Sequence, residues 1–290
     1  MTLRLLFSSD LHGNEIQYNK FFKFANQISA DILILGGDIS PKNKYENFIE
    51  NQREFFKYKL QEEIKKFKRK SPKPNIYLMM GNDDCSINLD VLDNPDLYQN
   101  IHGKRLKIND NFDIVGYSFV PITPFKLKDW EKFDMSNVPI YLKEYYEYRK
   151  KVNYRLDGFK STKDGWVDFL FDNDMEKSVS IQKDLENEIF TKNAGKTVYV
   201  IHTPPNNTNL DQTIRKDNVG SIAVRLFIEK YQPYLTLHGH IHETVDVSGK
   251  FKDIIGNTLC MASGNHNVGE DLAVIVLDLD KPGEAKRFKI

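Results

Sequence analysis

The sequence is poor in cysteine, with two in 290 residues, Cys85 and Cys260. Two cysteines so far apart in a chain of this length do not form the disulfide framework of a small secreted protein. The first ten residues pass directly from the initiator methionine into the apolar pattern of a strand, without the charged region, apolar segment and cleavage site of a secretion signal. We therefore expect a cytoplasmic protein.

The chain also lacks an excess of either charge and any long apolar run. Lysine plus arginine equals aspartate plus glutamate at 41 each, which leaves no overall field to attract nucleic acid or an anionic membrane. Residues 42–73 are locally basic, with KKFKRK at 65–70, a pattern that we interpret as a solvated helix. No apolar run approaches the roughly 18 residues that span a bilayer. Nucleic acid and membranes are therefore not expected as partners.

What is present is a composition able to form a large core, with 40% hydrophobic residues in a chain long enough for one large domain. Short apolar runs alternate with helix-like stretches over the first eighty residues, and further apolar runs occur at 196–202 and 233–239. This alternation indicates βαβ units and a largely parallel sheet. Apolar runs nearer the end of the chain are separated by turn residues, which is typical of antiparallel strands. We predict one α/β domain over residues 1–290.

Residues 121–195 interrupt this alternation. The segment opens with PITPFKLKDWEKFD and is too rich in aromatic side chains for a loose linker. We predict an ordered, mostly helical, cap-like insertion within the domain. It includes Phe125, Trp130 and Tyr145, whose rings are able to stack on a base or an aryl group of a substrate.

Metal-binding residue types recur where the predicted strands end. Histidine is scarce, with seven in the chain, yet three lie at alternate positions in LTLHGHIHE at 235–243, where an extended chain would point them the same way. Each candidate alone has an ordinary explanation as a helix cap, a turn residue or a loop histidine. The crevice of an open α/β sheet, however, lies beyond the carboxyl ends of its strands. The residues that fall there are Asp10, His12, Asp38, Asn82, His202, His240 and His242.

This mixture of carboxylate, amide and imidazole suits the hydrolysis of phosphoesters. A phosphate ester is an anion attacked by an anion, and two divalent cations about 3.5 to 4 Å apart hold its oxygens and lower the pKa of a bridging water. One carboxylate must bridge the two ions. Imidazole together with carboxylate favours manganese, iron, zinc or cobalt over calcium, which prefers oxygen ligands alone. We expect two divalent transition-metal ions, with manganese favoured.

The series DLH, GGD, GND, HTPP and HGHIH resembles the pattern of the calcineurin-like metallophosphoesterases, over residues 1–120 and 196 to about 280. The resemblance implies a four-layer α/β/β/α sandwich with a dinuclear metal site. By motif position, it assigns one ion to Asp10, His12 and His242, the other to Asn82, His202 and His240, and the bridge to Asp38. His238 falls outside these ligands and is interpreted as a structural or supporting residue.

One position departs from the family pattern. Where the family has the histidine of Gly-Asn-His, credited with contacting the substrate and protonating the leaving group, this chain has Asp83, followed by Asp84. Beside two dications the pKa of Asp83 is expected to be lowered, so that its carboxylate neither donates a proton nor attracts phosphate. His266 could approach the site but is interpreted as a surface loop residue, and His102 as a structural one.

The ligands and the resemblance favour a hydrolase. We expect a metal-dependent phosphodiesterase or phosphomonoesterase that attacks a small phosphorylated or nucleotide substrate with a metal-bridging hydroxide. The alternative from another class is a metal-binding protein-interaction scaffold with weak or no catalysis, although a scaffold has no need of seven filled ligand positions. A nuclease is less favoured because the net charge is zero. The substrate would be selected by the insertion and the loops.

Overall fold

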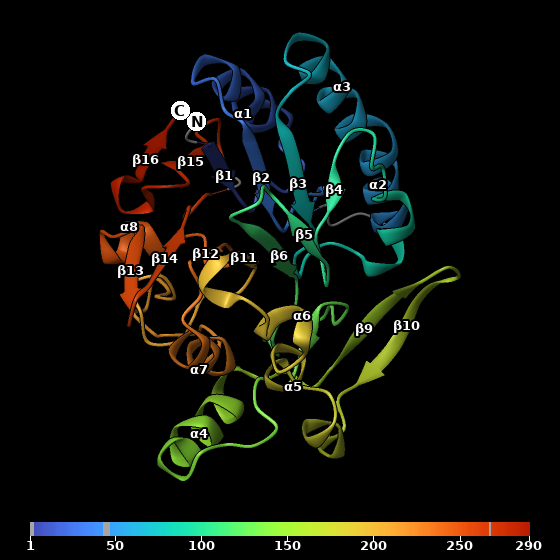
Figure 1. Ribbon diagram of the computed structural model, residues 1–290. Coiled ribbons are helices and arrows are strands. Elements are labelled where there is room, and N and C mark those ends of the chain that lie inside the picture. Colours follow the sequence, from blue (N-terminus) through green and yellow to red (C-terminus); the bar gives the residue numbers. More distant parts are fainter. Residues whose placement is uncertain (1–2, 43–46, 267) are drawn as a thin grey trace.

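The computed structural model describes residues 3–42, 47–266 and 268–290, and two six-stranded sheets dominate this part of the chain (Figure 1). The strands of the first sheet are, in spatial order, β16 (Lys286–Lys289), β15 (Ala273–Asp278), β1 (Arg4–Ser8), β2 (Ile32–Gly36), β3 (Asn75–Met79) and β4 (Gln99–Asn100). Strands β1 to β4 are parallel, and β15 lies antiparallel between β1 and β16. The parallel order predicted for the first eighty residues is confirmed.

The second sheet combines a parallel centre with antiparallel edges. Its strands are, in spatial order, β13 (Lys252–Ile255), β14 (Thr258–Ala262), β12 (Leu235–His238), β11 (Thr197–Ile201), β6 (Asp113–Tyr117) and β5 (Arg105–Lys107). The four central strands are parallel, whereas β13 and β5 pair antiparallel with their neighbours. The late apolar runs are strands as predicted, but they are divided between the two sheets.

Three apolar clusters position the helices and the sheets. Along β2, Leu33 belongs to a cluster with helical residues, whereas Ile34 belongs to the cluster between the two sheets, because alternate side chains of a strand face opposite ways. A third cluster joins Tyr199 of β11 to Phe227 of helix α7. The helices that cover the first sheet are α1 (Glu15–Gln27), α2 (Phe48–Glu54), the π-helical turn η1 (Phe55–Leu60) and α3 (Gln61–Lys70); α5 (Ile181–Leu185) and α7 (Ile222–Tyr231) cover the second (Figure 1).

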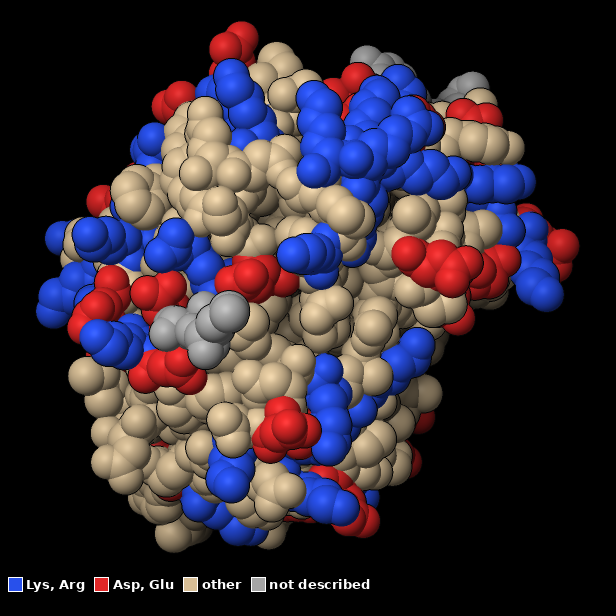
Figure 2. All heavy atoms as spheres, turned by 45° about the horizontal axis from the view of Figure 1, so that its top comes forward, with Lys and Arg blue, Asp and Glu red and all other residues tan. Residues whose placement is uncertain are grey.

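The basic stretch forms a nearly continuous helix from Phe48 to Lys70. Lys68, Arg69 and Lys70 lie in its last turn, where cations suit the negative end of the helix dipole. Figure 2 shows basic side chains gathered toward this end of the molecule, with acidic side chains among them. Among the described residues, no helix is both long and apolar enough to cross a membrane.

The segment 121–195 has mixed structure, which corrects the prediction that it is mostly helical. Its elements are β7 (Val120–Pro121), β8 (Glu131–Lys132), η3 (Ile140–Leu142), α4 (Lys143–Asn153), β9 (Asp157–Thr162), β10 (Gly165–Leu170), η4 (Asn173–Lys177), α5, α6 (Glu188–Thr191) and η5 (Ala194–Lys196). The β9–β10 hairpin projects from the body of the molecule (Figure 1). Met135 and Leu185 are nevertheless buried in the cluster under the second sheet. Part of this segment therefore belongs to the core.

Three short helices complete the fold. They are η2 (Ser86–Val91), α8 (Thr244–Ser248) and η6 (Pro282–Glu284). Helix α1 begins at Asn14, whose side chain accepts hydrogen bonds from the backbone N–H groups of Ile16 and Gln17. This cap starts the helix directly after the loop that follows β1.

Candidate metal centre

The seven residues selected from the sequence lie in the loops that follow strands. Two follow β1, one each follows β2, β3 and β11, and two follow β12, so both sheets contribute. Parallel strands end at the same edge of a sheet, and the two sheets pack against each other with these edges adjacent. The structure brings together Asp10, His12, Asp38, Asn82, His202, His240 and His242.

Several of these residues have left-handed backbone conformations. The φ angles are 60° at Asp10, 43° at His12, 51° at Asp38 and 70° at His240. Such angles are uncommon for residues with a Cβ and gather at functional sites. They also correct the expectation that LTLHGHIHE is extended, because β12 ends at His238 and the chain turns at His240. A turn, not strand alternation, brings the later histidines to the site.

One group of atoms is compact enough to hold a metal ion. Asp10, His12, Asp38 and His242 each offer a ligand atom, and these atoms lie within 4.8 Å of one another. Nε2 of His12 lies 3.3 Å from Nε2 of His242, which lies 3.5 Å from Oδ1 of Asp10. Two imidazole nitrogens and two carboxylate oxygens are a donor set that suits a divalent transition metal.

A second group adjoins the first at Asp38. The amide oxygen of Asn82 lies 2.7 Å from Nδ1 of His240 and 3.2 Å from Nε2 of His202. Nε2 of His202 also lies 3.4 Å from Oδ2 of Asp38, and the same oxygen lies 3.7 Å from Nε2 of His12. The carboxylate of Asp38 is therefore shared between the two groups.

Buried carboxylates require compensating positive charge at this site. Asp10 and Asp38 are each only 1% exposed. Burial opposes the ionisation of Asp38, but the charges of His202 and His12 and the hydrogen bonds to Asp38 together outweigh it and lower the pKa of Asp38. Burial also opposes the charged form of His202, yet Asp38, Asp10 and the backbone carbonyl of Gly36 together outweigh it and raise the pKa of His202 to about 10. A divalent cation between these groups would supply the same compensation as imidazole protons, so the residues fit a metal ion.

Glycines in the motifs allow the ligand loops to approach one another. A Cβ at Gly81 would lie 2.6 Å from Nε2 of His202, and a Cβ at Gly239 would lie 2.6 Å from Oδ2 of Asp10. At Gly37, where φ is 104°, a Cβ would collide with the ring of His202. Larger residues at these positions would displace the ligands.

Two supporting residues were missed by the sequence analysis. The buried carboxyl group of Asp84 accepts hydrogen bonds from the backbone N–H groups of Ser40 at 2.9 Å and Gly81 at 2.8 Å, and from the Ser40 hydroxyl. It thereby joins the loops after β2 and β3, while burial raises the pKa of Asp84 to about 7. Nδ2 of Asn265 donates to the backbone carbonyl of Asp10 at 3.1 Å. Of these two roles, only that of Asp84 has a signal in the sequence, which is the pair of adjacent acids in GNDD.

The other histidines lie outside the two groups. Both ring nitrogens of the buried His238 lie within hydrogen-bonding distance of protein oxygens, and burial lowers the pKa of His238 to about 4. His102 packs edge-on against Trp130, with ring centres 4.8 Å apart. His266 reaches the edge of the site, where its ring centre lies 6.5 Å from that of His242.

Asp83, which follows Asn82 in GNDD, lies beside the shared carboxylate. Its backbone N–H donates to Oδ1 of Asp38 at 2.8 Å, and its own Oδ2 lies 2.5 Å from Nζ of Lys42. The lowering of the pKa of Asp83 by two bound dications stays a prediction, whereas the groups of the protein alone raise this pKa. Burial is the largest cause, the charge of Asp38 adds to it, and together they outweigh Lys42.

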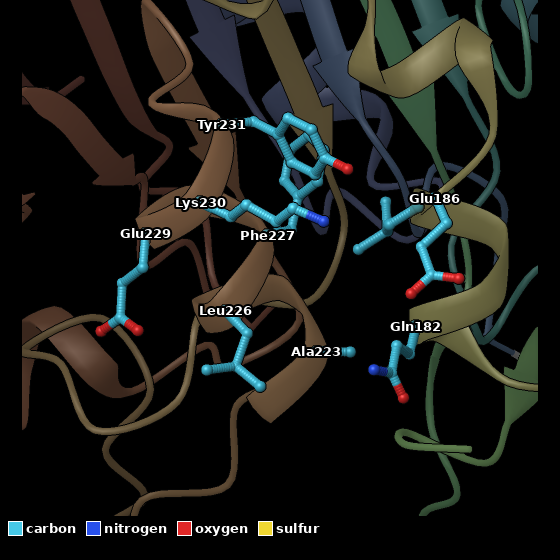
Figure 3. A pocket seen from close by; sticks show the side chains of 9 residues that line it. Gln182, Glu186, Ala223, Leu226, Phe227, Glu229, Lys230 and Tyr231 are labelled. Atoms are coloured by element: carbon cyan, nitrogen blue, oxygen red, sulfur yellow. The ribbon is translucent and has the colours of Figure 1, made fainter. Parts of the chain in front are cut away.

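A pocket of about 350 Å³ adjoins the second group at His240. Segment 121–195 contributes Phe125 and Arg149 to its wall, and the loop before α7 contributes Ile214 and Arg215. A larger hollow of about 420 Å³ lies between α5 and α7, where residues of the two helices face each other (Figure 3). That hollow contains none of the seven residues, so the smaller pocket is the one next to the site.

Of the three aromatic residues expected to stack on a substrate, only Phe125 lines this pocket. Trp130 is 4% exposed and belongs to the core, which corrects its expected role. Tyr145 accepts a hydrogen bond from Nδ2 of Asn206 at 3.1 Å and does not line the pocket.

Two sheets thus bring carboxylate and imidazole groups together at adjoining strand ends, which is the site of a metal-binding protein. The sequence model described as "Calcineurin-like phosphoesterase" matches residues 3–244. The chain therefore belongs to the calcineurin-like phosphoesterase family and is a metal-dependent hydrolase that acts on phosphoester bonds. No curated protein matches the sequence significantly.

Solved structures with low sequence identity share the fold. The protein TT1561 of Thermus thermophilus is 16% identical, with a TM-score of 0.54 over 100% of this chain and 99% of that chain. A dimetal phosphatase from Danio rerio is 10% identical, with a TM-score of 0.54 over 99% of this chain and 95% of that chain. At these identities the comparison supports the fold alone.

Proposed function

We propose that the protein is a phosphoesterase with two metal ions, and that manganese is the favoured metal. One ion would be held by Asp10, His12 and His242, the other by Asn82, His202 and His240, and both by Asp38. The observation that carries the proposal is the position of Asp38, whose Oδ2 lies 3.7 Å from Nε2 of His12 and 3.4 Å from Nε2 of His202. When bound, two such ions would lower the pKa of a bridging water and stabilise the phosphoryl oxygens.

Hydrogen bonds hold these ligands in place. Nδ1 of His202 lies 2.9 Å from the backbone carbonyl of Gly36, to which it donates, and this orients Nε2 toward the site. The backbone N–H of His240 donates to Oδ1 of Asp10 at 3.0 Å. The ligand positions are thus set by the protein, so binding costs little reorganisation.

The pocket beside His240 supports a small substrate. Its volume of about 350 Å³ is at the lower end of small-molecule sites. Its wall combines the apolar side chains of Phe125 and Ile214 with the guanidinium of Arg215. These groups suit a small phosphorylated molecule, such as a nucleotide, with an apolar or aromatic part, as a monoester or a diester. Both cysteines are free and buried, which supports the proposed cytoplasmic location.

Metal analysis and an ester panel test this proposal. The protein reconstituted with manganese should contain close to two ions and hydrolyse some of a panel of monoesters and diesters that includes cyclic nucleotides. Asp38→Asn should lose most of the metal and at least about 100-fold of the rate, because the bridging charge is removed. Asp90→Asn, which changes an exposed carboxylate paired with Arg53, is the matched control and should alter neither.

Two results would contradict the proposal. Folded protein that takes up no metal would remove its basis. Protein that binds two ions yet hydrolyses none of the esters would favour the interaction scaffold.

A further inference from the structure

A lysine lies beside the unusual aspartate at the mouth of the site. Nζ of Lys42 lies 2.5 Å from Oδ2 of Asp83, and 47% of the lysine side chain is exposed. The same ammonium lies 5.4 Å from the ring centre of Phe125, which lines the pocket next to His240. Lys42 therefore lies between the metal-binding loops and the pocket wall, and part of it remains accessible to a ligand.

The position of Lys42 is built into the fold. The buried side chain of Gln52, on α2, donates from Nε2 to the backbone carbonyls of Pro41 at 3.2 Å and Asp83 at 2.8 Å. Its Oε1 accepts from the backbone N–H of Cys85 at 2.7 Å. The side-chain amide of Gln52 thus connects Pro41, the residue before Lys42, to the loop that contains Asp83. The backbone is therefore held in place next to Lys42 and at Asp83, which positions the two members of the ion pair.

The charges around the site explain why a cation is needed there. A phosphoryl group that enters the site approaches the carboxyl groups of Asp10, Asp38 and Asp83, which repel an anion. Metal ions bound to Asp10 and Asp38 would offset two of these charges. Asp83 has no role as a ligand in the proposed site, and among the described residues the cation paired with it is Lys42.

Other cations near the pocket are less suited to this task. The guanidinium of Arg149 donates to the backbone carbonyls of Gly220 at 2.6 Å and Val219 at 2.8 Å, which commits it to the loop before α7. Arg215 is exposed in that same loop, and no contact joins it to Asp83 within the described part of the chain.

We infer that the ammonium of Lys42 binds the phosphoryl group of the substrate, in the place of the histidine that the family carries at position 83. The inference rests on the proposed function, because it requires a phosphoester at this site. Asp83 then acts as a positioning residue that orients Lys42. A charge-assisted hydrogen bond of this kind contributes about 1.5 to 3 kcal/mol, which corresponds to about 10- to 100-fold in affinity.

The test uses the manganese-loaded full chain and inorganic phosphate as the probe. Lys42→Met should weaken phosphate binding, measured by titration calorimetry, by about 10- to 100-fold, and should lower kcat/KM for a turned-over ester to a similar extent. Lys42→Arg should retain most of both, because it preserves the cation. Metal content should be unchanged in both variants, and thermal stability should be unchanged in Lys42→Arg, which keeps the ion pair with Asp83.

Lys126→Met is the matched control. Lys126 follows Phe125 in the chain, but its ammonium lies 5.9 Å from the ring centre of Phe159 and makes no ion pair with Asp83 among the described residues. Its loss removes the same charge from the residue next to Phe125, so it should change phosphate binding by no more than about 2-fold. An equal loss in both methionine variants would mean a general field effect and would overturn the inference.

The remaining outcomes separate the inference from the proposed function. If phosphate binding depends on Lys42 but no ester is hydrolysed, the inference stands and the proposed catalysis fails. If esters are hydrolysed and Lys42→Met is as active as the wild type, the inference fails and the proposed function stands. Wild-type protein that binds no phosphate would also overturn the inference.

Discussion

At the scale of single residues, Asp83 and Lys42 form an ion pair next to the candidate metal ligands. Burial opposes the charge of Lys42, but Asp83, with smaller effects from Asp38 and Asp10, outweighs it and raises the pKa of Lys42. An ammonium that keeps its proton at neutral pH is suited to binding phosphate and poorly suited to donating a proton to a leaving group. Lys42 therefore provides a cation beside Asp83 but is not an efficient general acid.

This combination predicts a strong dependence on the leaving group. Nitrophenyl esters, whose leaving groups are acidic, should be hydrolysed far better than simple alkyl phosphates, because a missing general acid costs about 10² to 10⁴ in rate. Asp83→His should narrow that gap, because histidine is able to donate the proton. The measurement is the slope of log rate against leaving-group pKa. A slope that is unchanged or steeper in the variant would contradict this account of Asp83.

At the scale of elements, the loops at the strand ends depend on the space that glycine leaves. Gly37 and Gly103 both have positive φ angles, of 104° and 62°. A Cβ at Gly37 would collide with the ring of His202, whereas a Cβ at Gly103 would have no atom within 4 Å. Gly103→Ala should therefore cost about 1 kcal/mol, the backbone penalty alone. Gly37→Ala should lower the free energy of unfolding by more than Gly103→Ala does, and it should also lower the metal content.

Urea unfolding of metal-free protein and elemental analysis of reconstituted protein would measure these two effects. Equal losses of stability in the two variants, with full metal content in both, would show that the glycine after β2 does not position His202.

The segment 121–195 provides one wall of the pocket through Phe125, and this predicts an effect on substrate choice. Phe125→Ala should lower kcat/KM for esters with aromatic or nucleoside groups by about 10-fold relative to small alkyl esters, since aromatic stacking contributes about 1 to 3 kcal/mol. Tyr148→Ala, an exposed residue of α4 that does not line the pocket, is the control. Unchanged relative rates for Phe125→Ala would contradict the assignment of this pocket.

Deletion of residues 121–195 is a poor test of their role in substrate access, because part of this segment lies in the core. Removal of all of residues 121–195 would take Met135 and Leu185 out of the core as well as Phe125 out of the pocket. A loss of activity in such a deletion would combine unfolding with altered access. Single substitutions on the pocket wall separate the two.

At the scale of the whole molecule, the partly buried His102 links stability to pH. Burial, with a smaller effect from Lys132, lowers the pKa of His102 to about 4 in the folded protein. In the unfolded chain a histidine has a pKa of about 6.5, so below that pH the unfolded state binds the proton more readily. The contribution of His102 should therefore lower the free energy of unfolding by about 2 to 3 kcal/mol as the pH falls from about 6.5 to about 4.

Urea unfolding of metal-free protein at pH 7 and pH 4.5 tests this linkage. His102→Gln keeps an acceptor for the backbone N–H of Ser118, which now donates to Nδ1 of His102 at 3.1 Å, and it removes the titrating group. The variant should lose less stability between the two pH values than the wild type. The same loss in both proteins would assign the acid sensitivity to other groups.

Much of the fold and most of the candidate site could be predicted because their signals are local. Alternating apolar runs predicted the parallel strands, and the residues after those runs include all seven ligand candidates. The expectation for residues 235–243 was right about the residues and wrong about the geometry, because the left-handed φ of 70° at His240 ends the extended chain. The mixed structure of segment 121–195 and the core position of Trp130 depend on packing, which periodicity does not report.

The sequence by itself determined which donor atoms are available and that they follow strands. Only the tertiary structure decided which of them meet, because two sheets must pack face to face before β1, β2 and β3 share an edge with β11 and β12. The contact between Lys42 and Asp83 also depends on the tertiary structure. The two residues lie in separate loops that the amide of Gln52 connects, and their spacing in the sequence does not indicate the contact. Local patterns specify strands and loops, whereas contacts between distant loops arise from the packing of the whole chain.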